Sequence, residues 1–322
     1  MTVQQLKEKI FFHKQISKPE AMFLTTAPMD QLCPAANEIR KHFCGNSFDI
    51  CTIINAKSGK CSEDCKFCAQ SSHYHTSTEA YPLLDTDKIL EEAKYNDVRG
   101  VLRYGIVTSG KNLTDAEVDK LCDSIRAVTK ETSIQVCVSC GLLTEPQFQK
   151  IKRAGATRVH NNLESSPCYF QQVCTTHTTA EKVATLKAAK RAGLSLCSGG
   201  IMGMGETMED RIDMVLLQRD LGIKSIPVNM LNPIPGTPYA HNQILSNEEM
   251  CRTVAIFRFL IPDASIRLAG GRGLLPDKGE ACFRSGANAA ISGDMLTTSG
   301  YTIESDLVLL KRLGYEVKLQ NE

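Results

Sequence analysis

The chain has 322 residues, enough for one α/β barrel or two ordinary domains. Its 37 basic and 36 acidic residues give a formal net charge of +1, so the charge gives no reason to expect binding to nucleic acid or to an anionic membrane. We therefore expect small-molecule partners. Fourteen cysteines are too sparse here for a small disulfide scaffold, and several lie in clusters suited to metal, which predicts a reducing, cytoplasmic location.

The amino-terminal segment carries charges among its apolar residues, so we expect neither a secretory signal nor a membrane span. Residues 1–48 are predicted to form a helical extension, because apolar residues recur at three-to-four spacing and the pattern ends at Gly45. Cys33 and Cys44 fall within this pattern and are expected to be structural thiols. Residues 49–322 are expected to form the main domain.

A short polar loop after the first predicted strand places Cys61, Cys65 and Cys68 in a C-x3-C-x2-C array. Three thiolates from one loop can hold three irons of a 4Fe-4S cube and leave the fourth iron open for a small bidentate ligand. Structural zinc prefers four ligands in paired clips, so the uneven triplet favours iron and sulfur over a zinc knuckle or free thiols. Cys51, which opens the preceding strand, is expected to be another structural thiol.

From residue 49 onward, short β-rich runs alternate with amphipathic helical patterns. Eight strands are predicted, at residues 49–55, 99–107, 133–140, 157–164, 194–201, 225–231, 265–271 and 288–294. Eight such units favour an α/β fold of the closed (β/α)8 TIM type over an open doubly wound sheet.

In a barrel of this kind the chemistry lies at the carboxyl ends of the strands. Polar and thiol residues recur within or just after several of the predicted strands, so we expect them to converge on one cavity. They are Cys137, Cys140, Asn161, Asn162, Glu164, Cys197, Asn229 and Arg267. Each has a simpler explanation when taken alone, because a strand-end asparagine commonly caps a helix and a lone cysteine commonly packs in a core.

Three of these thiols indicate a second metal centre. Cys137 and Cys140 form a Cys-x2-Cys pair, and Cys197 is expected to face them across the barrel. The pattern predicts a second iron–sulfur cluster deep inside the barrel, with zinc as the alternative.

The cysteine triplet resembles that of the radical S-adenosylmethionine enzymes, and the flanking NAKSG and CAQSSHY resemble the biotin synthases. The likeness extends over nearly the whole chain. It implies an enzyme that binds a 4Fe-4S cluster and S-adenosyl-L-methionine, cleaves the latter reductively, and uses the radical to insert sulfur into dethiobiotin. An auxiliary iron–sulfur cluster would supply the sulfur. The likeness also implies a flavodoxin- or ferredoxin-type electron donor and a homodimer.

The resemblance also implies ligands for the auxiliary cluster. Biotin synthases hold a 2Fe-2S cluster on three cysteines and one arginine, and this chain matches them at Cys137, Cys197 and Arg267. It departs at the second predicted strand, where Gly105 stands in place of a cysteine, and Cys140 is an addition. We therefore expect a four-iron cluster on Cys137, Cys140 and Cys197, with an open iron able to carry an extra sulfide. A 2Fe-2S centre on the same thiols with Arg267 is the alternative.

The likeness further assigns ligand-binding residues. Asn162 and Glu164 match residues that contact the cofactor ribose and the substrate, and a carboxylate is a sound acceptor for ribose hydroxyls. Asn229 matches a residue that helps to place the substrate ring. Thr297 and Thr298 match hydroxyl and amide donors near the substrate, although simple turn chemistry would also explain them.

Some features leave other interpretations open. His177 stands where the family tends to have an arginine that contacts the cofactor carboxylate, so that contact is not carried over. A related radical enzyme, such as a hydrogenase-cluster maturase or a lysine-rearranging mutase, would keep the first cluster but need not keep the segment around Asn229. A non-enzymatic metal or redox sensor would explain the thiols but not the strand-end asparagines.

Overall fold

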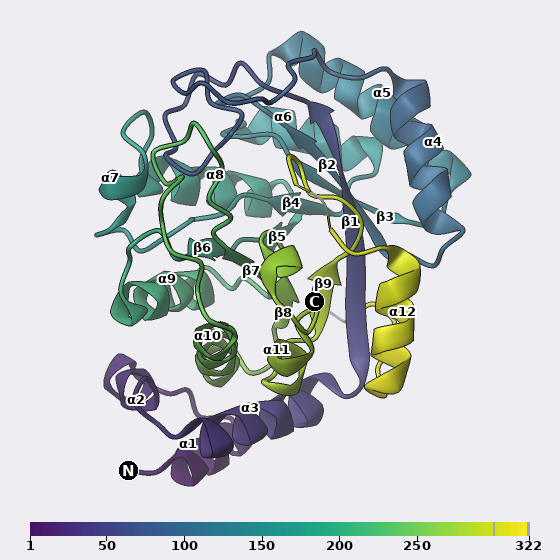
Figure 1. Cartoon of the computed structure of the whole chain (residues 1–322). Coiled ribbons are helices and arrows are strands. Elements are labelled where there is room, and N and C mark those ends of the chain that lie inside the picture. Colours follow the sequence, from purple (N-terminus) through teal and green to yellow (C-terminus); the bar gives the residue numbers. More distant parts are fainter. Residues whose placement is uncertain (299, 321–322) are drawn as a thin grey trace.

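The computed structural model describes residues 1–298 and 300–320. Eight parallel strands follow one another around a ring, and the last pairs with the first, so the sheet closes into a barrel (Figure 1). These are β1 (Ser47–Lys57), β2 (Arg103–Thr108), β3 (Gln135–Ser139), β4 (Arg158–His160), β5 (Ser195–Cys197), β7 (Ser225–Met230), β8 (Ser265–Leu268) and β9 (Ala289–Ile291). The predicted α/β fold of the (β/α)8 type is confirmed, and each predicted run overlaps a barrel strand.

Two short strands complete the sheet. β6 (Gly200–Met202) follows β5 after a break of two residues and also pairs with β7, so the predicted fifth strand is divided. Gly199 lies in the break, where only a residue without a side chain fits, because a Cβ atom there would lie 1.8 Å from the Pro227 carbonyl oxygen of β7. β10 (Glu316–Val317) pairs with the first two residues of β1, outside the closed ring.

Helices cover the outside of the barrel. They are α4 (Thr86–Asp97), α5 (Asp115–Glu131), α6 (Glu145–Ala154), α7 (Phe170–Val173), α8 (Thr179–Arg191), α9 (Met208–Asp220), α10 (Asn247–Leu260), η1 (Arg272–Leu274), α11 (Glu280–Arg284) and α12 (Ile303–Arg312). Thr114, Thr178 and Thr207 begin α5, α8 and α9 with reciprocal capping boxes, which fix where the loops at the carboxyl ends of the strands stop. In the described parts of the chain, no helix combines the length and apolarity needed to cross a bilayer.

Three helices precede the barrel, as the periodicity predicts: α1 (Val3–Phe11), α2 (Lys18–Leu24) and α3 (Met29–Cys44). α3 ends at Gly45, whose φ of 58° suits a residue without a side chain. They lie at the end of the molecule where β1 begins, and α3 packs against α10 (Figure 1). The division of the chain at residue 48 stays a prediction.

Candidate active site

A cavity of about 340 Å³ lies inside the barrel and extends to the loops at the carboxyl ends of its strands. Its lining brings together most of the residues that the sequence singled out. These are Cys68, Cys137, Asn162, Glu164, Cys197, Asn229, Arg267, Thr297 and Thr298. Residues far apart in the sequence therefore face one space, as expected where parallel strands end at the same rim of a barrel.

Cys140 is not brought to this cavity. It is buried beside Thr108, on the side of β3 that faces α5, where Cys122 and Glu117 lie near it. Successive side chains of a strand point to opposite faces, so a spacing of three places Cys140 opposite to Cys137. Burial raises the pKa of the Cys140 thiol to about 12. The expected Cys-x2-Cys pair facing Cys197 is not formed.

Cys51 lines the cavity instead, although its place near the start of a strand predicted a structural thiol. Arg267 Nη1 donates a hydrogen bond to Cys51 Sγ at 3.1 Å. The strand alternation contains a signal for this placement. In the run from Asp49 to Asn55, the polar and thiol side chains of Asp49, Cys51 and Asn55 all fall on one face, and that face is turned into the barrel.

Asp49 lies beneath the cavity in contact with three buried arginines. Its Oδ2 lies 2.9 Å from Arg103 Nε, 2.9 Å from Arg267 Nη2 and 3.8 Å from Arg158 Nη1. Burial alone would raise the pKa of Asp49, but the three guanidinium groups hold it below its usual value. We call Asp49, Arg103, Arg158 and Arg267 the arginine floor. With one anion and three cations, the arginine floor leaves a positive charge below the thiols of the cavity.

The loop that carries Cys61, Cys65 and Cys68 is folded back on itself. Cys68 N donates to Cys65 O at 2.9 Å, and Cys61 N donates to Gln70 O at 3.0 Å. Burial raises the pKa of Cys68 to about 11. The thiolate is the form that binds metal, so a bound metal ion would have to offset this effect of burial.

The segment 174–177, which follows α7, holds this loop in place. Asp64 Oδ1 accepts hydrogen bonds from Thr175 N at 2.8 Å and from Thr176 N at 3.2 Å. Glu63 Oε2 accepts from Thr176 Oγ1 at 2.8 Å and pairs with His177 Nδ1 at 2.6 Å. His177 is therefore engaged with the loop itself, at the position where the likeness would place a cofactor-binding arginine.

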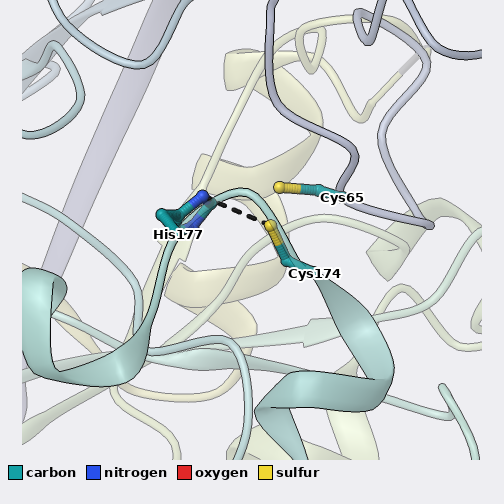
Figure 2. A group of neighbouring side chains, drawn as sticks. All are labelled: Cys65, Cys174 and His177. Carbon is teal, nitrogen blue, oxygen red and sulfur yellow. Dashed lines mark hydrogen bonds between the residues drawn. The ribbon is translucent and has the colours of Figure 1, made fainter.

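Cys174 is a further thiol that the sequence analysis did not single out. Its sulfur lies 3.2 Å from His177 Nδ1, and the ligand atoms of Cys65, Cys174 and His177 all lie within 4.8 Å of one another. Figure 2 shows the two sulfur atoms and the ring turned toward each other. Because Cys65 already belongs to the triplet, this group forms part of the surroundings of the triplet rather than a separate site.

Glu164 adopts a strained conformation at the rim of the cavity. Its φ of 68° is uncommon for a residue with a side chain. Glu164 Oε2 is buried and has no hydrogen-bond partner among the described residues, and burial raises the pKa of the carboxyl group. The neighbouring Asn162 accepts a hydrogen bond from Gly199 N at 2.9 Å. An unsatisfied buried acceptor in a cavity wall can accept a hydrogen bond from a bound ligand.

Asn229 joins two strand ends across the cavity wall. Its Nδ2 donates to Gly200 O at 2.9 Å, and its Oδ1 accepts from Gly270 N at 2.9 Å. The loop with Thr297 and Thr298 closes another side of the cavity, and Asn55 Nδ2 donates to Leu296 O at 3.2 Å to hold that loop near β1.

Two family models match this chain. The Radical SAM superfamily model matches residues 56–217, and the Biotin and Thiamin Synthesis associated domain matches residues 227–316. The first match includes the triplet loop, Cys137, Glu164 and Cys197, and the second includes Asn229, Arg267 and both threonines.

Several proteins named biotin synthase are similar over nearly their full length. The protein from Brachyspira hyodysenteriae is 57% identical over 322 residues, covering 100% of this chain and 97% of that protein. The protein from Akkermansia muciniphila is 57% identical, with 94% of this chain and 95% of that protein covered. The protein from Clostridium botulinum (strain Alaska E43) is 50% identical, with 98% and 99% covered.

Solved structures support the fold. Methylornithine synthase matches with a TM-score of 0.85 at 19% identity, covering 98% of each chain. The FeFe-hydrogenase maturase from Carboxydothermus hydrogenoformans matches with a TM-score of 0.81 at 16% identity, covering 97% of this chain and 78% of the maturase. At these identities the likeness extends to the barrel and not to the reaction.

Proposed function

This chain belongs to the biotin synthases of the radical S-adenosylmethionine superfamily, and from that membership we propose which residues carry out its reaction. The enzymes of this family insert sulfur into dethiobiotin to form biotin. The observation that carries the assignment of residues is the shared cavity, where Cys68 of the triplet loop faces the same space as Cys137 and Cys197. A radical formed at the triplet would then arise in the same enclosed space as the sulfur source.

Cys61, Cys65 and Cys68 are the proposed ligands of the 4Fe-4S cluster, because three thiols on one anchored loop leave one iron free for S-adenosyl-L-methionine. When bound, this cluster supplies the electron that cleaves S-adenosyl-L-methionine, and the auxiliary cluster supplies the sulfur. The residues around them orient the reactants and exclude water. Glu63 and Asp64 fix the loop, and the apolar part of the cavity keeps solvent from the reacting carbon.

Glu164 is the proposed acceptor for the ribose hydroxyls of S-adenosyl-L-methionine, with Asn162 beside it. The unsatisfied Oε2 of Glu164 supports this role, since a hydroxyl donor would complete its hydrogen bonding. Asn229, Thr297 and Thr298 are the proposed contacts to dethiobiotin, whose cyclic urea has both donors and acceptors. Their place in the cavity wall supports the proposal.

Cys137 and Cys197 are proposed to bind the auxiliary cluster above the arginine floor. An iron–sulfur cluster with its thiolates is anionic, and the positive charge of the floor offsets part of that charge where the dielectric constant is low. We favour a four-iron cluster, with a 2Fe-2S centre that uses Arg267 as the alternative. The hydrogen bonds that Arg267 makes to Asp49 and Cys51 support the first choice, because they occupy its guanidinium group.

Two measurements test the proposal on anaerobically purified protein. Incubation with S-adenosyl-L-methionine, dethiobiotin and a reductant is expected to release 5'-deoxyadenosine and biotin. Iron and sulfide counts with Mössbauer spectroscopy are expected to give about eight irons per chain, all in four-iron clusters, whereas the alternative gives about six. Protein that holds only zinc, or that holds iron and leaves dethiobiotin unchanged, would contradict the proposal.

Family likeness alone suggests three further properties, which we include in the proposal. They are a flavodoxin- or ferredoxin-type electron donor, a homodimer and a cytoplasmic location. Sedimentation of the iron-loaded protein tests the dimer, and reduction of the first cluster by purified flavodoxin or ferredoxin tests the donor.

A further inference from the structure

We propose that Cys51 is a third thiolate ligand of the auxiliary cluster, together with Cys137 and Cys197, and that Cys140 takes no part. This inference rests on the proposed function in one respect, because it requires an auxiliary cluster in the cavity. It changes the ligand set expected from the sequence by exchanging a thiol on the outer face of β3 for one on the inner face of β1.

The three thiols face one another inside the barrel. Cys51, Cys137 and Cys197 all line the same cavity, from β1, β3 and β5. Each of the three lies within electrostatic range of the other two, since Cys137 is influenced by Cys51 and Cys197, and Cys51 by Cys197. Three thiols arranged in this way can bind one cluster from three sides of the barrel, as three ligands suffice for a cluster with one open iron.

The strand between β1 and β3 contributes no thiol. Gly105 of β2 pairs with Ile53 on one side and with Cys137 on the other. A Cβ atom at Gly105 would lie 3.0 Å from Ile53 Cγ2, so a cysteine there would crowd the isoleucine. Gly105 also lines the cavity, and its missing side chain leaves the space beside Cys137 open.

Hydrogen-bond donors lie around two of the three sulfurs and would stabilise them as thiolate ligands. Arg267 Nη1 donates to Cys51 Sγ at 3.1 Å, and Ser225 Oγ donates to Cys197 Sγ at 3.2 Å. The His160 ring also lies 3.4 Å from Cys197 Sγ. N–H and O–H groups directed at a sulfur stabilise negative charge on it and tune a bound cluster.

The same contacts give Arg267 a supporting role. Its guanidinium group donates to the Asp49 backbone oxygen at 2.9 Å and pairs with the Asp49 carboxylate at 2.9 Å. These bonds fix it beneath Cys51 as a donor to sulfur. In this proposal Arg267 is therefore a positioning residue, and Cys51 is the residue that ligates iron.

The experiment first removes the iron of the 4Fe-4S cluster, so that the iron of the auxiliary cluster can be measured alone. In full-length protein with Cys61, Cys65 and Cys68 all changed to alanine, the iron and sulfide that remain after anaerobic reconstitution belong to the auxiliary cluster. In this background we expect Cys51→Ser to lose most of that iron or to change its Mössbauer spectrum. Cys140→Ser is the matched control, since it removes a buried thiol that lies outside the cavity, and we expect it to keep both the iron content and the spectrum.

The outcomes distinguish this inference from the proposed function. If the triple-alanine background holds no iron–sulfur cluster, both fail together. If it holds one that is unchanged by Cys51→Ser, or that is lost in Cys140→Ser, only the assignment of Cys51 is overturned. Circular dichroism of the metal-free proteins checks folding, and Cys51→Ala provides a second variant with the same expected loss.

Discussion

At the scale of single residues, the charge balance of the arginine floor is the most consequential feature. Three guanidinium groups and one carboxylate are all buried, and burying unpaired charge is costly. Asp49 is thus needed to balance the charge of the three arginines when no cluster is present. An anionic cluster above the arginine floor would supply part of that negative charge.

We expect Asp49→Asn to destabilise the metal-free protein by about 3–5 kcal/mol, because it removes the carboxylate that pairs with three buried cations. The loss should be smaller in the cluster-loaded protein, where the cluster supplies negative charge. Urea unfolding of both forms measures the difference. Equal losses in the two forms would show that the arginine floor does not respond to the charge of a cluster.

We expect Glu164→Gln to weaken the binding of S-adenosyl-L-methionine by about 10- to 100-fold, the loss typical of a hydrogen bond to a charged acceptor. The first cluster should remain, since Glu164 is not one of its proposed ligands. Anaerobic equilibrium dialysis with labelled S-adenosyl-L-methionine measures the affinity. Glu91→Gln, on the exposed side of α4, is the control. An affinity equal in both variants would remove Glu164 from the cofactor site.

The sequence anticipated most of the residues that line the cavity, but it misplaced Cys140 and missed Cys51. Triplet spacing and family motifs selected Cys68, Glu164 and Arg267, all of which line the cavity. Cys140 was chosen by spacing alone, although the two-residue period of a strand puts it on the other face from Cys137. Cys51 was missed because a thiol near the start of a strand is commonly a packing residue.

At the scale of elements, the triplet loop depends on the segment 174–177 for its position. We expect Asp64→Asn to lose part of this anchoring, because the carboxylate accepts from the backbone amides of both Thr175 and Thr176. The first cluster should then release iron to a chelator about 10-fold faster, in line with a loss of about 1–2 kcal/mol. Asp87→Asn, on the exposed side of α4, is the control. An unchanged release rate would mean that the loop is held without Asp64.

Helix α4 carries the carboxyl group of Glu92 in a partly buried position that disfavours its charged form. Burial raises the pKa of Glu92 to about 7, and the phenols of Tyr81 and Tyr104 are its titratable neighbours. The folded state binds the proton of the Glu92 carboxyl group more tightly than the unfolded state does. This contribution to the stability of the folded protein is therefore lost as pH rises from about 4.5 through about 7.

We therefore expect Glu92→Gln to stabilise the protein at about pH 8.5 and to have little effect at about pH 5. The gain should be about 1 kcal/mol, allowing for the partial exposure of the side chain. Thermal melting at both pH values measures it, with Glu91→Gln as the exposed neighbour on the same helix. A gain of the same size at both pH values would contradict the pH-dependent cause.

The elements themselves were largely predictable, because each barrel strand is a β-rich run bounded by an amphipathic helix. The division between β5 and β6 was not. Gly199 lies at this division and closely approaches Pro227, a residue 28 positions away that the closed barrel brings near. Periodicity is a local signal and does not report such contacts.

At the scale of the whole molecule, the closure of the barrel could be predicted from the sequence, but the position of the amino-terminal helices could not. Eight βα units predict a closed barrel, and the pairing of β9 with β1 provides the closure. The place where the amino-terminal helices dock was not predictable, because a helical pattern shows that a helix has an apolar face but not which element covers that face.

We propose that this extension and the barrel fold as one unit. α10 is buried on nearly all sides, and α3 covers one of them. Arg258 of α10 donates to Cys44 Sγ at 3.3 Å, and Arg252 donates to Ala27 O at 2.7 Å. Removing residues 1–44 would expose the apolar side chains of α10 and leave these donors without their partners in the extension.

We therefore expect a chain that begins at residue 45 to aggregate, and Leu32→Asp in the full chain to be destabilised by at least about 3 kcal/mol, because the change puts a charge into the packed face of α3. Gln31→Asp, its exposed neighbour, should be tolerated. Soluble yield and thermal melting of the three proteins measure these effects. The opposite result is a truncated chain that stays soluble and melts cooperatively at the temperature of the full chain. Because α3 would then contribute nothing to the stability of the barrel, this result would show that the barrel folds without the extension.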